Sequence, residues 1–420
     1  MVGMLRLMGG GANLSLVSGY NRGVVLEAIR SAGTISRVEL TRLVGLTAPT
    51  VSNIVRRLIA EGFVVEAGRG PSTGGKPRTL LRLNPAARYA VGVQLDPHST
   101  DYVVTDLGGE VVARARGRGA GRRAPAEVID TVSTAVRSLV RDAGIPAERV
   151  VGIGVALPGP LQHDRGIVLA PPNLPRWREV PLRDLLAAAA GFPVLIDNDA
   201  TAAAVAERWK GSAAAARNFA CIYMGAGIGS GIVVNGRVHR GSSSNAGEVG
   251  HISLNIDGEP CHCGNRGCLE LYAAPRAVVA AARAHLAGNP AAALRLPARS
   301  RGTHADYLRI CRAALEGEPF AGGLIRRAAS HLAVAVVSLV NILDLELVVL
   351  AGPGFDNVGD RYVEAVRDAL DRSAFARDNH SLEVRLSPLG ADAGAVGAAS
   401  LVLHTEFAPQ LLGRPVQSAS

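Results

Sequence analysis

The sequence predicts an α/β protein in which an N-terminal winged helix-turn-helix is followed by a larger body of two lobes, each with a mixed sheet. Three observations support this prediction. Residues 21–58 contain three helical patterns separated by short turns, and a glycine- and arginine-rich loop follows them. From Tyr89 onward, apolar strand segments alternate with helical ones, as in α/β architecture. Residues 1–90 hold twelve basic and four acidic side chains, which accounts for +8 of the net charge of +9.

We divide the 420 residues into five parts. They are an N-terminal arm (1–20), the winged domain (21–88), a first lobe (89–210) that is rejoined by a C-terminal helix at about 391–404, a second lobe (211–390) and a tail (405–420). The longest apolar run, Leu332 to Leu350, is interrupted by polar residues, so it predicts a buried helix and strand and not a membrane span. The chain starts without a secretory pattern, and we expect a soluble cytoplasmic protein.

Two helices open the winged domain. The first helical pattern covers residues 21–32. In the second, Ser36 and Glu39 have the spacing of a capping box, in which each side chain bonds to the backbone of the other residue. The side chains expected on the buried side of this second helix are Val38, Leu43 and Val44.

The third helix has the pattern of a DNA-recognition helix. Thr47 stands at its N-cap, and Pro49 is tolerated in the first turn. The side expected to face the core carries Val51, Ile54, Val55 and Leu58. The opposite side carries Thr50, Ser52, Asn53, Arg56 and Arg57. Short polar groups near the helix start can reach base edges, and the guanidinium groups can reach phosphates.

A basic loop follows the recognition helix. Strands predicted at 63–66 and 80–83 enclose it, and its cations include Arg69, Lys76 and Arg78. Such a loop fits a wing that lays cations along the DNA backbone or in the minor groove. The alternative is a structural three-helix domain with a charged linker. Helix spacing, polar outer face and basic wing agree, so we expect this domain to bind double-stranded DNA.

Three of the five cysteines form a cluster, Cys261, Cys263 and Cys268, and His251 lies ten residues before the first of them. Three thiolates and one imidazole complete a tetrahedral structural zinc site, so we expect one zinc ion per chain. His262 is a competing ligand, but a residue between two ligand cysteines tends to point away from the metal. Disulfides fit poorly, because three clustered cysteines cannot all pair and the expected compartment is reducing.

Two further segments could carry chemistry. The glycine-rich segment Gly225–Gly231 lies between two strands, so it differs from a dinucleotide-binding turn, which opens a helix. It could wrap a phosphate with backbone N–H groups, or it could be a tight turn. Asp197, Asn198 and Asp199 follow a strand, where a carboxylate could deprotonate a hydroxyl. On local sequence alone, capping of the following helix is the favoured interpretation of these residues.

Together these motifs resemble the ROK family, which contains bacterial sugar kinases and sugar-responsive repressors, over roughly residues 20–403. The most specific part is Glu248-Val-Gly-His251 followed by the cysteine cluster and Leu-Glu270. The resemblance implies an actin-like (ribonuclease H-like) sugar kinase fold for the body. It also implies a transcription regulator with a sugar or sugar-derivative effector, acting as a homodimer or homotetramer on an inverted-repeat operator.

The resemblance further implies a sugar pocket. Its expected members are Gly159, Asn173, Asn198, Asp199, Glu248, His251 and Glu270. In the family the position of Asp199 is that of the catalytic base. His251 would bind zinc through one ring nitrogen and the sugar through the other. Convergent amide and carboxylate groups are the partners that a polyol needs.

The phosphate side departs from the family pattern. Family kinases place Asp-x-Gly-Gly-Thr after the first strand, whereas this chain has Gln94 at the Asp position and continues Leu-Asp-Pro97-His. Ala226 stands where kinases usually carry Thr, and Pro353 alters the nucleotide-side segment. We therefore expect a sensor without kinase activity. The alternatives are an active ATP-dependent, glucokinase-like sugar kinase with an attached DNA-binding domain, and a DNA-binding protein whose sensor no longer binds sugar.

Overall fold

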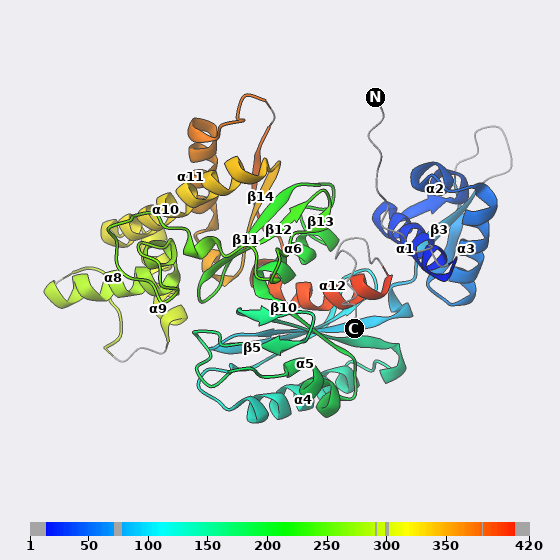
Figure 1. Cartoon of the computed structure of the whole chain (residues 1–420), viewed down its shortest axis with the longest axis horizontal. Coiled ribbons are helices and arrows are strands. Elements are labelled where there is room, and N and C mark those ends of the chain that lie inside the picture. Colours follow the sequence, from blue (N-terminus) through cyan, green and yellow to red (C-terminus); the bar gives the residue numbers. More distant parts are fainter. Residues whose placement is uncertain (1–13, 71–77, 290–291, 299–301, 380, 408–420) are drawn as a thin grey trace. The chain divides into compact units, whose positions relative to one another are not determined.

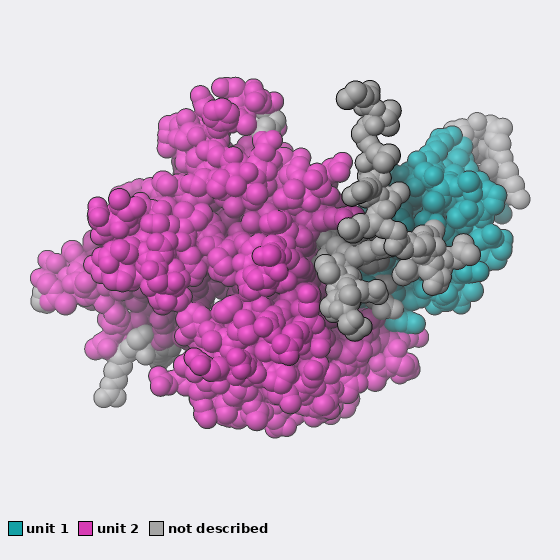
Figure 2. Space-filling view, in the orientation of Figure 1, with its two compact units in different colours: residues 1–88, 403–418, 420 teal, residues 89–402, 419 magenta. Residues whose placement is uncertain are grey.

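The structure is a computed structural model that describes residues 14–70, 78–289, 292–298, 302–379 and 381–407 (Figure 1). The chain divides into two compact units (Figure 2). The head comprises residues 1–88 and the segment from Leu403 to Ser418, and the body comprises residues 89–402. Lys76 of the predicted wing lies outside the described residues, as do most of the predicted arm and most of the predicted tail.

The head combines three helices with a small antiparallel sheet. Its elements are α1 (Leu14–Ala32), β1 (Thr34–Ser36), α2 (Arg37–Val44), α3 (Ala48–Ala60), β2 (Val64–Arg69) and β3 (Thr79–Leu83). The strand order is β1–β3–β2, so the unpredicted strand β1 extends the hairpin of the wing. All three helices and the sheet contribute fully buried side chains to one core, among them Ile29, Leu40, Val55 and Leu81.

Helix α2 differs from its prediction on the side that it buries. Its N-terminus is as predicted, because the capping box between Ser36 and Glu39 is complete. Leu40 is its buried residue, whereas Val38 is 44% and Leu43 63% exposed. The prediction for these two residues was wrong, because an eight-residue helix packs through a single narrow face. At 3.6 residues per turn, Val38 lies on the side opposite Leu40, whereas Leu43, three residues after Leu40, lies near the same face but is exposed in the last turn of the helix.

The first lobe of the body is built on a five-stranded sheet of order β10–β7–β4–β5–β6. Its strands are β4 (Tyr89–Leu95), β5 (Ser99–Asp106), β6 (Val111–Arg118), β7 (Val150–Leu157) and β10 (Val194–Asn198). Strands β10, β7 and β4 are parallel, and β5 and β6 continue antiparallel. Helices α4 (Pro125–Asp142) and α5 (Leu182–Ala190) pack on one face of the sheet. A small ribbon of β8 (Leu161–Gln162) and β9 (Ile167–Val168) lies between β7 and α5 in sequence.

The opposite face of this sheet is covered by α12 (Ala393–Phe407), drawn in red in Figure 1. The helix lies very close to the strands because glycines face it. A Cβ atom at Gly92 would lie 1.9 Å from the carbonyl oxygen of Ala395, and one at Gly154 would lie 1.8 Å from that of Ala398. Two glycines on neighbouring strands therefore let a backbone rest directly on the sheet.

The second lobe has a sheet of order β13–β12–β11–β14–β15. Its strands are β11 (Phe219–Met224), β12 (Ile228–Val234), β13 (Arg237–Val238), β14 (Leu347–Ala351) and β15 (Glu383–Leu386). Its helices are α6 (Asp199–Trp209), α7 (Glu270–Ala273), α8 (Pro275–Gly288), α9 (Thr303–Leu315), α10 (Pro319–Leu343) and α11 (Gly359–Ser373). The predicted hairpin around the glycine-rich segment is present, since β11 and β12 pair antiparallel. Both lobes thus have the mixed sheets that the sequence predicts.

Helix α10 is long and apolar enough to cross a membrane by length and composition, and 56% of that stretch is buried inside the protein. Its buried residues, among them Leu324, Ala328, Leu332 and Val336, belong to the core of the second lobe. The predicted helix and strand at 332–350 correspond to the end of α10 and to β14. This packing is that of a core helix.

Candidate functional sites

The predicted metal ligands come together in one cluster. Each of His251, Cys261, Cys263 and Cys268 offers one ligand atom, and these atoms all lie within 4.8 Å of one another. The Sγ atom of Cys261 lies 3.6 Å from Nδ1 of His251, and the Sγ atoms of Cys263 and Cys268 are 3.7 Å apart. Three thiols and one imidazole at this spacing are the donor set of a tetrahedral structural zinc site.

His262 also approaches the cluster, with its Nδ1 atom 3.7 Å from Sγ of Cys261. Its side chain is exposed, whereas His251 is half-buried. The loop closes through Gly267, which has φ +59°, and a Cβ atom there would lie 1.9 Å from the carbonyl oxygen of Asn255. The tight return of the chain at this glycine brings Cys268 back to the cysteines before it.

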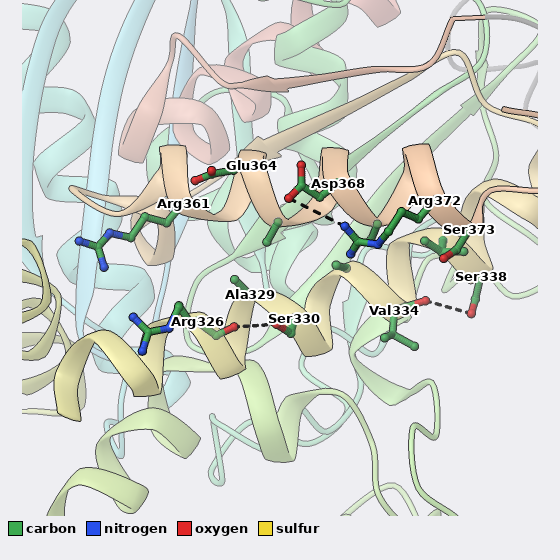
Figure 3. Close-up of a pocket in the computed structure, with 14 residues that line it drawn as sticks. Arg326, Ala329, Ser330, Val334, Ser338, Arg361, Glu364, Asp368, Arg372 and Ser373 are labelled. Carbon is green, nitrogen blue, oxygen red and sulfur yellow. Dashed lines mark hydrogen bonds and ion pairs between the residues drawn. The ribbon is translucent and has the colours of Figure 1, made fainter. Parts of the chain in front are cut away.

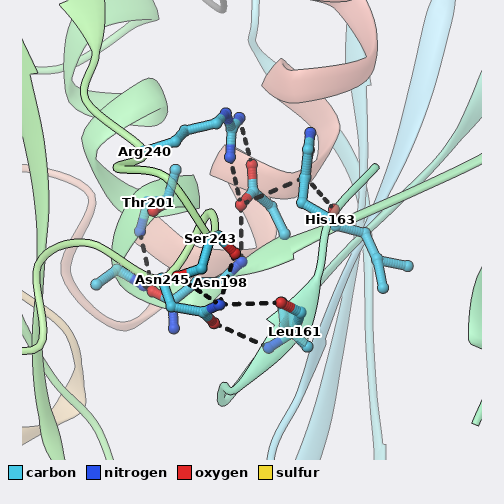
Figure 4. Close-up of polar contacts among 10 residues, drawn as sticks. Leu161, His163, Asn198, Thr201, Arg240, Ser243 and Asn245 are labelled. Atoms are coloured by element: carbon cyan, nitrogen blue, oxygen red, sulfur yellow. Dashed lines mark hydrogen bonds and ion pairs between the residues drawn. The ribbon is translucent and has the colours of Figure 1, made fainter. Parts of the chain in front are cut away.

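The segment Asp197–Asp199 lies at the end of β10 and the start of α6 (Figure 4). Arg240 holds Asp197 through an Nη1–Oδ1 hydrogen bond of 2.8 Å and an Nη2–Oδ2 distance of 2.7 Å. Asn198 is the N-cap of α6, since its Oδ1 accepts from the N–H groups of Ala200 and Thr201. Asn198 therefore caps α6, and Asp199 is the first residue of the helix.

Burial raises the pKa of Asp199 to about 7, and the charges of Glu248 and Glu270 add to this rise. Desolvation likewise raises the pKa of Glu248, with Glu270 contributing again. These three carboxyl groups therefore lie near one another, with Glu270 buried, Asp199 half-buried and Glu248 exposed. A carboxyl whose pKa lies near neutrality can both accept a proton and bind a hydroxyl.

Several predicted pocket residues meet around Gly159. The Cβ position at this glycine lies 3.6 Å from Nδ2 of Asn198 and 3.6 Å from Oε1 of Glu248. Asn245 closes the same corner, because its amide exchanges two hydrogen bonds with the backbone of Leu161, at 2.9 and 3.1 Å (Figure 4). A glycine here keeps the corner free of a side chain.

Glu270 joins the pocket to the metal loop. It is buried, its Oε1 accepts from the backbone N–H of Ile228 at 2.9 Å, and its Oε2 lies 2.7 Å from Nη2 of Arg276. It follows Cys268 by two residues, as Glu248 precedes His251 by three. Of the predicted pocket, Asn173 lies half-buried in the segment between β9 and α5, and its role stays a prediction.

The region around the glycine-rich segment and the loop after β4 contains residues that the sequence motifs do not predict. Tyr223 is 2% exposed, and Cβ positions at Gly225 and Gly352 lie 3.1 and 2.9 Å from its ring. Asp96 carries a carboxyl whose pKa is raised to about 7 by burial and by the charge of Asp199. Arg240 and Asn245 were missed too, because they lie in a loop without a motif. Tyr223 lies in an apolar strand, and Asp96 lies in the turn between β4 and β5, so no local pattern marks either residue as functional.

The proposed DNA-contacting residues lie on the outer side of the head. Asn53, Arg56 and Arg57 on α3 are exposed, and Nη1 of Arg56 donates to Oδ1 of Asn53 at 3.1 Å. Thr47 occupies the N-cap position, but its hydroxyl bonds to that of Thr50 at 2.8 Å and caps no backbone group. The remaining described members are the half-buried Ser52 on α3 and the exposed Arg69 and Arg78 at the two ends of the wing.

A groove of about 770 Å³ lies between α10 and α11 (Figure 3). Its charged side chains have both signs, with Arg326 and Arg361 opposed by Glu364 and Asp368. None of the predicted sugar, metal or DNA residues lines it, so it is separate from the sites described above.

The fold and these sites define a winged-helix DNA-binding protein with a sugar-kinase-like body. The ROK family model matches residues 90–405, and a winged helix-turn-helix DNA-binding model matches residues 21–65. The chain belongs to the ROK family and is a DNA-binding transcription regulator of that family.

Individual relatives agree with this assignment. The chain is 31% identical over 408 residues to a putative xylose repressor from a Caldicellulosiruptor species, covering 94% of this chain and 98% of that protein. It is also similar to the crystal structure of a ROK family transcriptional regulator described as a homologue of the E. coli MLC protein. That match has a TM-score of 0.77 and 25% identity, and covers 93% of this chain and 98% of that one. A ROK glucokinase from Streptomyces griseus, in complex with glucose and AMPPNP, matches 74% of this chain and 98% of its own, with a TM-score of 0.65 and 28% identity.

Proposed function

We propose that this regulator is controlled by a neutral sugar or sugar derivative bound in the body. The observation that supports this most directly is the meeting of Gly159, Asn198 and Glu248 at one corner, with Glu270 close enough to Asp199 to raise its pKa. Convergent carboxylate and amide groups in a partly buried site suit a polyol. Relatives named xylose repressors make a pentose a natural first ligand to test.

Zinc is the metal that we propose for the cysteine cluster, with His251 as the fourth ligand. Its role would be structural, because four protein ligands leave no open coordination position for a substrate. Through Nδ1, which faces Cys261, His251 would bind the metal and keep Nε2 for a sugar hydroxyl.

The head would bind an inverted-repeat operator in the cytoplasm as part of a homodimer or homotetramer, because two-fold DNA sites are matched by two recognition helices. Arg56, Arg57 and the wing cations Arg69, Lys76 and Arg78 would contact phosphates. The polar groups of Thr47, Thr50, Ser52 and Asn53 would lie toward the bases.

Operator binding tests this proposal. DNA fragments from the protein's own locus are titrated with the full-length chain, with and without xylose, glucose or N-acetylglucosamine, and followed by fluorescence anisotropy. We expect one sugar to change the apparent Kd for DNA at least about fivefold. Arg57→Ala should lower DNA affinity and flatten its salt dependence while leaving sugar binding unchanged. Failure of every such fragment to bind would refute the proposal.

A second candidate function is ATP-dependent phosphorylation of the sugar. The raised pKa of Asp199 favours it, because a carboxyl with a pKa of about 7 suits a general base. A coupled ADP-release assay with glucose would decide between the two functions, with Asp199→Asn as the variant that abolishes turnover. We expect no turnover, because the segment from Gln94 to His98 lacks the glycines with which a backbone approaches phosphate.

A further inference from the structure

The loop after β4 carries an acidic side chain where family kinases have the first glycine of their phosphate loop. This residue is Asp96. Its Oδ2 accepts a hydrogen bond from Nε2 of Gln94 at 3.3 Å. Its Oδ1 and the Oε1 of Gln94 are enclosed and have no hydrogen-bond partner among the described residues, and Gln94 as a whole is only 2% exposed. Two acceptor oxygens therefore stand unsatisfied at this position.

The charges around Asp96 are mostly negative. Asp199 and Asp101 are the negative charges that act on it, and both raise its pKa. Arg116 lowers that pKa only weakly, since this guanidinium is 67% exposed and already pairs with Asp101 at 2.9 Å. Asp96 and Asp199 directly follow the carboxyl ends of β4 and β10, which run parallel in one sheet on either side of β7, and Asp199 belongs to the proposed sugar pocket. Asp96 therefore adds a fourth carboxyl to a region that already contains Asp199, Glu248 and Glu270.

Three backbone N–H groups in the loop after β4 and in the glycine-rich segment are already engaged in hydrogen bonds within the protein. The N–H of Asp96 donates to the carbonyl of Ser99 at 3.0 Å, and that of Gly225 donates to the carbonyl of Gly227 at 3.0 Å. In the same glycine-rich segment, the N–H of Ile228 donates to the Glu270 carboxylate. Neither loop offers these donors to an anion without breaking a bond of its own.

We propose that Asp96 makes the sugar pocket selective for ligands without a phosphate group. This inference rests on the proposed sugar-binding function. Sugar hydroxyls carry no charge, so the Asp96 carboxylate does not repel them. An ionised phosphate would instead place a dianion beside the carboxylates of Asp96 and Asp199, and juxtaposed like charges oppose binding. Sugar phosphates and the γ-phosphate of a nucleotide are excluded by the same side chain.

Paired titrations test the inference with the full-length protein at about pH 8. At this pH the carboxyl groups of Asp96 and Asp199, whose pKa values are raised to about 7, are mainly ionised. Isothermal titration compares xylose with xylose 5-phosphate, glucose with glucose 6-phosphate, and N-acetylglucosamine with its 6-phosphate. We expect a neutral sugar to bind at least about tenfold more tightly than its phosphate. Asp96→Asn, which keeps the size of the side chain, should reduce this ratio about tenfold while the Kd of the neutral sugar changes less than about threefold. Asp142→Asn, which removes an exposed charge from the same lobe, should leave the ratio unchanged.

The outcomes separate the two hypotheses. Tighter binding of a sugar phosphate to the unmodified protein, or an unchanged ratio in Asp96→Asn, overturns the role of Asp96 and leaves a sugar-responsive regulator standing. Because binding of the neutral sugar by the variant shows that it is folded, an unchanged ratio cannot be attributed to unfolding. Binding of none of the six compounds refutes the proposed sugar function and the inference with it.

Discussion

Replacing Arg240 tests the structural support of the pocket. Its guanidinium is 15% exposed and faces an Asp197 carboxylate that is 2% exposed. Arg240→Met removes the cation and leaves the buried Asp197 carboxylate without its guanidinium partner, and loss of one partner of a buried ion pair typically costs about 3–5 kcal/mol. Asp197→Asn removes the negative charge but keeps an oxygen that can accept from the backbone N–H of Asn198, which bonds to Asp197 Oδ1 at 2.9 Å. The double variant should therefore lose at least about 2 kcal/mol less than the sum of the single variants.

Tryptophan fluorescence during urea unfolding measures this effect in the body alone. The chain has two tryptophans, and Trp177 and Trp209 are both buried within residues 89–402. Because Asn198 follows Asp197 directly, sugar affinity should fall about tenfold in Arg240→Met and recover in part in the double variant. A loss below about 1 kcal/mol in Arg240→Met, or full additivity in the double variant, would show that the pair is not a buried ion pair in solution.

Three further predictions concern packing, metal and pH. Gly154→Ala should destabilise the body by about 3 kcal/mol or more, because its Cβ would meet a backbone oxygen at 1.8 Å. The control Gly288→Ala, whose Cβ would meet nothing within 4 Å, should be neutral or stabilising in the same urea titration. Cys263→Ser should lose stoichiometric zinc in elemental analysis and lower the Tm, while His262→Ala should keep the metal. Loss of zinc from His262→Ala would show that His262 is a ligand, and retention of zinc by Cys263→Ser would show that Cys263 is not. The pKa of Asp96 is raised from 3.8 to about 7, so this carboxyl costs stability as the pH rises through that window. Asp96→Asn should gain stability relative to the unmodified protein between pH 5 and pH 8, and parallel pH profiles would contradict this.

Features encoded within a few consecutive residues were predictable from the sequence. The capping box of Ser36 and Glu39 forms as expected, because both partners lie in one turn. The cysteine cluster forms too, since its spacing is set by a short loop. The proposed sugar pocket rests on the family resemblance, because it joins Gly159 to Glu248 across about ninety residues, which spacing alone cannot connect.

Features that depend on which side of an element meets a neighbour were not predictable. Leu43 is apolar and lies in a helix, yet it is 63% exposed, because periodicity gives the possible faces and only packing selects one. The pairing of Arg240 with Asp197 spans 43 residues and has no local pattern. Asp96 appeared as a departure from a motif, and its importance follows from Asp199 and Gln94, which approach it in space.

The proposed metal cluster and the proposed sugar pocket share one segment of the chain. Glu248 lies three residues before the proposed ligand His251, and Glu270 lies two residues after the proposed ligand Cys268, so the proposed metal-binding segment begins and ends beside the carboxylates of the proposed pocket. Glu270 is further fixed by the N–H of Ile228 and by Arg276, whereas the pKa of Glu248 is raised by desolvation and no ion pair with another described residue offsets this rise. A structural metal would therefore contribute most to the position of Glu248. Removal of the metal should weaken sugar binding before it unfolds the body, because Asn198 and Asp199, at the junction of β10 and α6, are held by the sheet of the first lobe and by the Arg240–Asp197 pair.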